Sequence, residues 1–347
     1  MGTIVAGTTF GFHVKTRQDE MMKKSLLALP GAGIATLLAG GFAGKRKIAE
    51  WAENPDPLNG APVQFPDAER RTVPLGDGTE IAVWIVGAGP TIVLVHGLTA
   101  SHHDWGPIAP LLVDAGYRVV AIDQRGHGES TAGTAGYGSA QLGTDLADVF
   151  NALDLHVLAL VGHSMGAMAS MGFAAGHPKL FNERVSSFVS VTSSGATDAV
   201  RQSLGLRLGA IKLPERLTQI QAERLRLLTG LSVFGKDPSL HMIDEAIAAV
   251  RKCPEDVRAP ATLALKEHDV LEALQQMKVP ALIIGAGRDQ LVRPEQIVDL
   301  HAAIPNSEMH MYPDAGHMVL WEEYEDVAER IVQFVQSVGQ QAVQTTT

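Results

Sequence analysis

The sequence predicts an α/β fold built on a mostly parallel sheet, and two observations support this prediction. The first is a set of short apolar runs rich in Val and Ile, with no polar face. These runs cover residues 91–95, 118–122, 157–161, 185–191 and 281–284. Uninterrupted apolar runs of this length suit strands that are covered on both faces of a parallel sheet. The second is the regular appearance of helix-like segments between the runs, an alternation typical of α/β sheets.

The individual elements follow from local patterns. Residues 71–75 and 81–86 are predicted to pair as strands around the turn Gly76-Asp77-Gly78, and residues 309–312 to add a late strand. The predicted helices of the body cover residues 105–115, 139–153, 165–175, 295–303 and 324–338.

Composition excludes several classes of protein. The 347 residues carry 28 basic and 38 acidic side chains, a formal net charge of −10, so nucleic acid is not an expected partner. The single cysteine, Cys253, excludes an internal disulfide and is expected to be a non-catalytic thiol. We expect neither a metal nor an organic cofactor. The oligomeric state is not readable from the sequence.

The alternation of strands and helices breaks between residues 194 and 278, where helical patterns such as 214–229 and 240–251 occur without a convincing strand. We interpret 194–278 as a helical cap inserted in a core of 67–193 and 279–340. It would lie over the carboxyl ends of the strands, where open α/β sheets bind ligands. The alternative is a chain of ordinary surface helices.

Residues 1–66 form a predicted amino-terminal extension. Segment 25–44 has no charged residue and is long enough to cross a bilayer, but Gly, Ala and Pro30 weaken its apolar character. Two interpretations remain open. One is membrane association or export; the other is a helix of small residues packed on the catalytic domain or on another subunit, with the protein in the cytoplasm. Four prolines between residues 54 and 66 indicate a linker.

The motif Gly162-His163-Ser164-Met165-Gly166 predicts a nucleophilic serine. It follows an apolar strand directly and precedes a helix of small residues, the arrangement that the G-x-S-x-G turn requires. Glycines fit where side chains would clash, and the sharp turn presents the hydroxyl of Ser164 to the cleft.

A serine needs a neighbouring base, and His317 is the candidate because it follows a predicted strand on a loop. Asp289, at the end of another strand, is the candidate acid that orients the imidazole of His317. The order Ser, Asp, His agrees with such serine hydrolases. Asp314 is nearer to His317 in sequence but would come from the wrong loop.

An oxyanion hole needs two backbone N–H donors. We expect one from Met165, the residue after the nucleophile, and one from Leu98, in the loop after strand 91–95. Candidates for the substrate pocket are His102, His103, Trp105 and His163. The first two could instead cap the helix that follows, and His163 could be structural.

The sequence resembles the α/β-hydrolase family through "HGLTASHHDW", "DQRGHGES", "LVGHSMGAMAS", "IIGAGRDQLVRP" and "DAGHMVLWE", in that order. The residues within these motifs are similar to those of bacterial, actinobacterial-type family members that resemble esterases or lipases. The resemblance implies an eight-stranded, mostly parallel sheet with a cap after the sixth strand. Ser164 disfavours haloalkane dehalogenases and epoxide hydrolases, which have aspartate there. The H-G-L-T loop disfavours the hormone-sensitive-lipase type.

The expected activity is hydrolysis of a small-molecule carboxylic ester with an apolar acyl or alkyl group. The apolar residues of the cap motivate this expectation, although they could equally be its core: Leu225, Leu227, Leu228, Leu231, Val233 and Phe234. A thioesterase, lactonase, C–C bond hydrolase or cofactor-free perhydrolase would share the same residues. The alternative to an enzyme is a binding or scaffold protein that has the hydrolase fold but catalyses no reaction.

Overall fold

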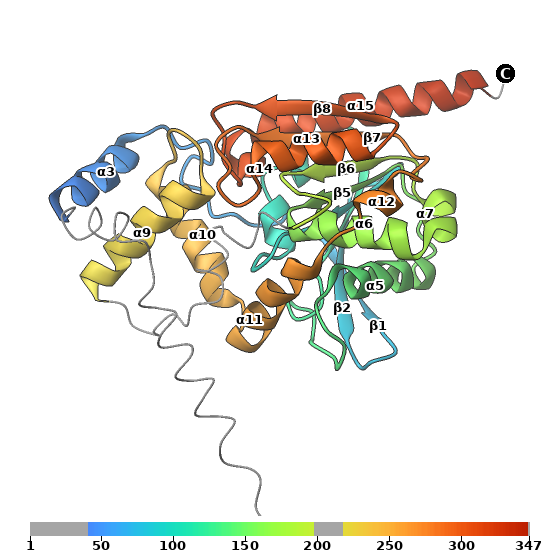
Figure 1. Cartoon of the computed structure of the whole chain (residues 1–347), viewed down its shortest axis with the longest axis horizontal. Helices are drawn as coiled ribbons and strands as arrows, with labels where there is room; N and C mark the ends of the chain where they lie inside the picture. The colour runs from blue at the N-terminus through green and yellow to red at the C-terminus, as the bar shows by residue number, and fades with distance from the viewer. Residues whose placement is uncertain (1–40, 198–217, 346–347) are drawn as a thin grey trace, which may run out of the picture. The chain divides into compact units, whose positions relative to one another are not determined.

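The computed structural model describes residues 41–197 and 218–345 (Figure 1). The chain divides into two compact units, residues 1–47 and 48–347. Of the apolar segment 25–44, all but residues 41–44 lies outside the described residues; those four begin helix α3 (Gly41–Glu53). Among the described residues, no helix has both the length and the apolar character needed to span a bilayer.

A mixed sheet of eight strands organises the second unit, in the order β1-β2-β4-β3-β5-β6-β7-β8. The strands are β1 (Glu69–Pro74), β2 (Glu80–Val86), β3 (Thr91–Val95), β4 (Arg118–Ile122), β5 (Ala159–His163), β6 (Phe188–Val191), β7 (Ala281–Ala286) and β8 (Ser307–Tyr312). Only the pairings of β2 with β1 and β4 are antiparallel. The predicted fold class is confirmed.

Two strands begin later than predicted. The apolar runs 157–161 and 185–191 contain β5 and β6, which start at Ala159 and Phe188. Val157 and Val185 form an isolated parallel bridge before these strands. The apolar residues of each run mark it as part of a buried strand, whereas the start of the strand depends on pairing with a segment distant in the sequence.

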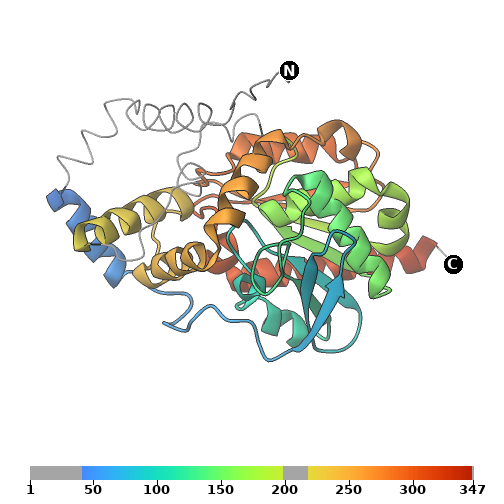
Figure 2. The same cartoon turned by 90° about the horizontal axis from the view of Figure 1, so that it is seen from below.

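Helices lie on both sides of the sheet (Figures 1 and 2). Those of the core are α4 (Ala109–Asp114), α5 (Ser139–Ala152), α6 (Met165–Gly176), α7 (Pro178–Arg184), α13 (Pro294–Ala303), α14 (Val319–Glu322) and α15 (Tyr324–Thr345). Helix α7 was not predicted. The helix predicted over 105–115 is instead the 3-10 turn η1 (His102–Trp105), which Gly106 ends, followed by α4.

Strand β3 separates the two layers of the core. All five of its residues are buried. Val93 and Val95 join the apolar cluster that includes α5 and α6, whereas Ile92 and Leu94 join the cluster that includes α4 and α15. This two-sided burial explains why β3 is apolar at every position after Thr91 instead of alternating.

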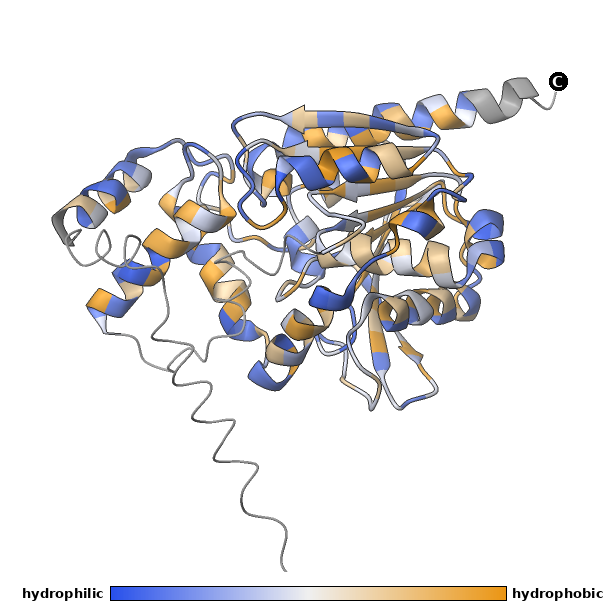
Figure 3. Cartoon of the chain, in the orientation of Figure 1, coloured by the Kyte–Doolittle hydropathy of each residue, from blue (hydrophilic) through white to orange (hydrophobic). Residues whose placement is uncertain are grey.

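Helices α5 and α6 pack at very short range through glycines. A Cβ atom on Gly143 would lie 2.4 Å from the backbone of Gly172 and Phe173, and one on Gly172 would lie 2.1 Å from the Ser139 carbonyl oxygen. Residues 165–173 of α6 are all buried, in keeping with its lack of a hydrophilic face (Figure 3). The glycines therefore set how deeply α6 lies in the core.

The region between β6 and β7 contains α9 (Gln219–Val233), α10 (Leu240–Lys252), α11 (Glu255–Ala264), η3 (Leu265–Glu267) and α12 (Leu271–Leu274). No strand occurs in its described part, residues 194–197 and 218–278. The helix predicted over 214–229 begins at Gln219, where Thr218 and Gln221 form a capping box, and residues 214–217 lie outside the described residues. Helices α9 and α10 pack against each other.

The segment 54–66, expected to be a linker, has no helix or strand. It nevertheless packs on the core, because Leu58 and Phe65 are buried in the same apolar cluster as α4 and α15.

We predict that Gly143→Ala lowers the free energy of unfolding by about 2 kcal/mol or more, because its new methyl group would collide with backbone that cannot move aside. Urea denaturation measures this change. Gly176→Ala, at the end of α6 with no atom within 4 Å of the added Cβ, is the control and should change stability little. Equal effects of the two substitutions would refute the close packing of α5 on α6.

Candidate active site

Ser164 occupies a strained turn between β5 and α6. Its backbone angles are φ 50° and ψ −118°, a conformation that costs a residue other than glycine of order 1–3 kcal/mol. A Cβ on Gly162 would meet the Ala167 nitrogen at 2.4 Å, and one on Gly166 would meet the Val95 carbonyl oxygen at 2.2 Å. Both glycines of the motif are thus required by close backbone contacts.

A chain of hydrogen bonds joins Ser164, His317 and Asp289. The Oγ atom of Ser164 lies 2.9 Å from Nε2 of His317, and Nδ1 of His317 lies 2.7 Å from Oδ2 of Asp289. His317 and Asp289 are 6% and 2% exposed. The structure brings together the three residues predicted as nucleophile, base and acid; their catalytic roles remain a prediction.

Further hydrogen bonds fix the orientation of these groups. Oδ1 of Asp289 accepts from the backbone N–H groups of Leu291 and Val292, at 2.7 and 2.9 Å. The carbonyl oxygen of His317 accepts from Thr192 Oγ1 at 3.0 Å. Oδ1 of Asp289 therefore accepts hydrogen bonds from its own loop, whereas Oδ2 accepts one from His317. Asp314, the rejected alternative, pairs at the surface with Arg288.

The Glu322 carboxylate ties the His317 loop to the segment after α9. It accepts from the N–H groups of Gly316 and Gly235, at 2.9 and 2.8 Å. Burial raises the pKa of Glu322 to about 7, against the opposing effect of these two hydrogen bonds. Sequence analysis did not single out this residue, since no local pattern reveals which amides it faces.

The two amides proposed for the oxyanion hole lie on segments that touch at the turn. A Cβ on Gly97 would lie 3.4 Å from Cβ of Ser164, so the loop that contains Leu98 packs directly on the serine. Within the described part of the chain, the N–H groups of Leu98 and Met165 donate to no other group. Two backbone N–H groups without acceptors, next to a nucleophile, could donate hydrogen bonds to the oxygen on which negative charge develops during the reaction.

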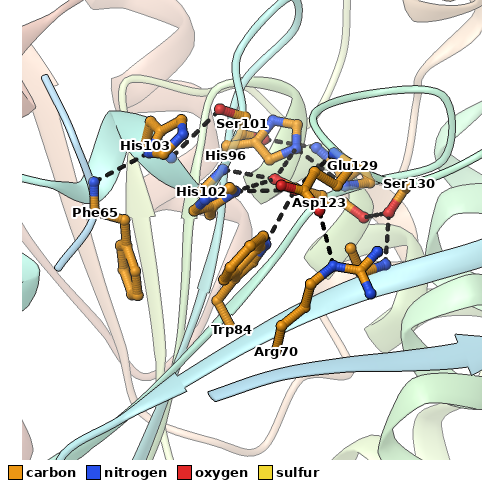
Figure 4. Close-up of polar contacts among 12 residues, drawn as sticks. Phe65, Arg70, Trp84, His96, Ser101, His102, His103, Asp123, Glu129 and Ser130 are labelled. Atoms are coloured by element: carbon orange, nitrogen blue, oxygen red, sulfur yellow. Dashed lines mark hydrogen bonds and ion pairs between the residues drawn. The ribbon is translucent and has the colours of Figure 1, made fainter. Parts of the chain in front are cut away.

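A buried polar network around Asp123 includes His96, the residue directly before Gly97 (Figure 4). The Asp123 carboxylate accepts from Nδ1 and the backbone N–H of His102, from Trp84 Nε1 and from the Glu129 N–H. Burial raises its pKa, but the His102 hydrogen bond and the electrostatic interactions with His96 and His102 outweigh burial, so the net pKa is lowered. Asp123 is therefore an ionised, structural carboxylate.

His96 is held in one neutral form by the same network. Its Nδ1 donates to the Gly97 carbonyl at 2.7 Å, while its Nε2 accepts from the Gln124 N–H at 3.0 Å. Complete burial, reinforced by His127, lowers the pKa of His96 to about 3. These contacts give His96 a structural role in the loop.

A cavity of about 180 Å³ opens beside Ser164 and His317. Its lining is mainly apolar and includes Met168 of α6, residues of α9 and α10, and Trp321. Of the apolar residues expected in the cap, Leu225 and Val233 line this cavity, Phe234 is buried in the core, and Leu231 is 57% exposed. Helices α9 and α10 therefore line the cavity beside Ser164, as a helical cap over the site would.

A second cavity, of about 210 Å³, adjoins the first. The two share five lining residues: Thr99, Ala100, Asp104, Ala249 and Trp321. Asp104 is 6% exposed, and burial with the nearby Asp123 charge raises its pKa to about 7. Sequence analysis missed Asp104, because the residues that bury it come from distant segments.

The four predicted pocket residues separate into three environments. His163 lines the first cavity, and its Nε2 lies 3.1 Å from the His317 carbonyl oxygen. His102 and His103 line the second cavity. Trp105 is fully buried in the core and lines neither cavity. Among the described residues, no group of three or more His, Cys, Asp or Glu side chains could hold a metal ion.

The model of the Alpha/beta hydrolase family matches residues 92–330. The chain belongs to this family. An uncharacterized Mycobacterium tuberculosis protein is 27% identical over 290 residues, covering 77% of this chain and 81% of that protein. A 2-hydroxy-6-oxononadienedioate/2-hydroxy-6-oxononatrienedioate hydrolase of Paraburkholderia phymatum is 28% identical, covering 75% and 93%.

Solved structures show the same fold. An esterase from Exiguobacterium antarcticum superimposes with a TM-score of 0.66 at 22% identity, covering 77% of this chain and all of that one. Family membership supports hydrolase activity in general.

We predict that Glu322→Ala slows the reaction of Ser164 with a fluorophosphonate by about tenfold, because the loop of His317 loses the carboxylate that holds it and small misplacements of a base are costly. Labelling rates measured by gel fluorescence check this result. Glu323→Ala, at the adjacent exposed position, should react like the wild type. Equal rates in all three proteins would contradict the role given to Glu322.

We predict that Asp104→Asn is more stable than the wild type at pH 8, by about 1–3 kcal/mol, and not at pH 4. The pKa of Asp104 is raised in the folded state, so its ionisation costs stability as the pH rises from about 4 through 7. Urea denaturation at the two pH values measures the difference. A stability difference independent of pH would contradict the assignment.

Proposed function

We propose that the protein is a serine hydrolase that cleaves carboxylic esters with an apolar acyl group. The observation that carries this proposal is the serine–histidine pair, 2.9 Å apart, at a mainly apolar cavity. A serine hydroxyl becomes a useful nucleophile when a base takes its proton, and an apolar cavity binds an acyl chain by removing it from water.

The proposed mechanism has two steps. Ser164 Oγ attacks the ester carbonyl while His317 Nε2 takes its proton, and the amides of Leu98 and Met165 donate to the oxyanion. His317 then protonates the departing alkoxide, leaving an acyl group on Ser164. Water, deprotonated by His317, attacks this acyl-enzyme; the bond between the acyl carbon and Ser164 Oγ breaks, His317 returns the proton to Oγ, and the acid leaves. Asp289 keeps the Nδ1 proton of His317 in place and stabilises the imidazolium.

The size of the cavity favours short to medium acyl chains. An apolar protein cavity of about 150 Å³ accommodates benzene, and the cavity beside Ser164 has about 180 Å³. We therefore expect an optimum at acyl chains of about four to eight carbons.

Cleavage of C–C bonds is the second candidate, because the Paraburkholderia phymatum relative is named as a hydrolase of dienedioates and trienedioates. The lining of the cavity beside Ser164 argues against a substrate that places a carboxylate in this cavity. Within the part of the chain that the structure describes, this lining contains no lysine or arginine to pair with a carboxylate. Thioesters, lactones and peracid formation require no such cation and are tested by a substrate panel.

We predict that Ser164→Ala lowers kcat for p-nitrophenyl octanoate by about 10⁴-fold or more, because the nucleophile is lost. Spectrophotometric assays over acyl lengths of two to twelve carbons measure both this loss and the length optimum. Ser170→Ala is the matched control: Ser170 is buried six residues later in α6, donates to the Gly166 carbonyl and lines neither cavity.

A wild type that hydrolyses no chain length, yet is labelled on Ser164 by a fluorophosphonate, would contradict ester hydrolysis while retaining the serine mechanism. Equal activity of wild type and Ser164→Ala would contradict both.

A further inference from the structure

Asp104 is a buried carboxyl group with no role in the mechanism above. It lies in the turn η1, is 6% exposed, and belongs to the shared wall of the two cavities. Its backbone carbonyl accepts a hydrogen bond from Trp321 Nε1 at 2.9 Å, which fixes the position of the main chain at this residue.

The side chain of Asp104 has no hydrogen-bond partner in the described part of the chain. Asp123, in the same region, shows the contrast: its carboxylate accepts from two side chains and two backbone amides (Figure 4). A buried carboxyl group without a partner is costly and therefore exceptional in folded proteins. A buried, unpaired acid facing the cavities is the kind of group that a bound molecule would satisfy.

The second cavity supplies a polar environment beside the apolar one. His103, Glu129, Glu245 and Lys252 contribute to its lining. Three of these polar groups already have partners: Glu129 pairs with Arg70, Glu245 accepts from the Val63 N–H, and His103 Nδ1 accepts from the Phe65 N–H. An ester whose acyl chain fills the apolar cavity would extend its alcohol half past Asp104 into polar surroundings.

We propose that Asp104 and the second cavity bind the alcohol half of the ester, with the Asp104 carboxyl hydrogen-bonded to a hydroxyl group of that alcohol. This inference rests on the proposed ester hydrolysis. It assigns the substrate class as esters of an apolar acid with a polyhydric alcohol such as glycerol.

A neutral hydroxyl fits this site better than an ammonium group. Burial raises the pKa of Asp104 to about 7, so near neutral pH the carboxyl both donates and accepts hydrogen bonds, as a hydroxyl partner requires. Glu129 is paired with Arg70, and the charges of Lys252 and Glu245 offset each other, so the lining of the second cavity has no net negative charge that would favour a cationic alcohol.

The test compares two esters that differ only in hydroxyl groups: 2,3-dihydroxypropyl octanoate and propyl octanoate. The measured quantity is the ratio of their kcat/KM values in full-length wild type, Asp104→Leu and Asp104→Asn. We expect the wild type to prefer the dihydroxypropyl ester by about tenfold, since a site built to bind a hydroxyl rejects the analogue that lacks it. Asp104→Leu should abolish the preference.

Asp104→Asn should keep part of the preference, because the amide still donates and accepts. Asp114→Leu, the same substitution at an exposed position outside both cavities, should keep the wild-type ratio. A purely structural role of Asp104 would lower turnover of both esters together and leave the ratio unchanged.

An identical ratio in wild type and Asp104→Leu overturns the inference while ester hydrolysis stands. So does a wild-type preference for 2-(dimethylamino)ethyl octanoate, whose alcohol half is cationic, over the dihydroxypropyl ester. Failure of the wild type to hydrolyse these esters and p-nitrophenyl octanoate overturns the proposed function itself, and the inference with it.

Discussion

The strained backbone of Ser164 is the constraint on which the site depends. A serine at φ 50° persists only because its surroundings permit no other path for the chain. Gly166 lets the start of α6 pack on the carbonyl groups of Val95 and His96, and Gly162 lets β5 approach Ala167. The glycine contacts of α5 with α6 extend the same close packing away from the turn, so the fold holds the serine in place from several sides.

Buried charge is distributed unevenly around this turn. Asp289 and Asp123 are both buried, and each has several hydrogen-bond donors. His96 and His163 are buried with lowered pKa values, so they contribute hydrogen bonds without positive charge. A neutral, water-poor setting strengthens the electrostatic interactions of the remaining groups. Asp104 differs from these two aspartates because no described residue donates a hydrogen bond to its carboxyl group. This difference suggests that a bound ligand forms the missing hydrogen bond.

Much of the fold and the proposed chemistry could be predicted because their signals are local. A strand covered on both faces is apolar at successive positions, as in β3, and a serine turn needs glycines two residues before and after it. The predictions were less accurate where distant segments decide the outcome. Strands β5 and β6 begin only after an isolated bridge between Val157 and Val185, and Trp105, expected at the pocket, lies in the core. Asp104 and Glu322 were missed for the same reason: Trp321 and the loop at Gly235 reach them only through the tertiary fold.

In the proposed mechanism, Ser164 becomes covalently acylated during turnover. The most direct measurement is peptide mass mapping of the full chain after brief mixing with p-nitrophenyl octanoate and an acid quench. We expect an added octanoyl group on the peptide that contains Ser164, and no such addition in Ser164→Ala. Turnover without an acylated peptide, or acylation at another residue such as Cys253, would contradict it.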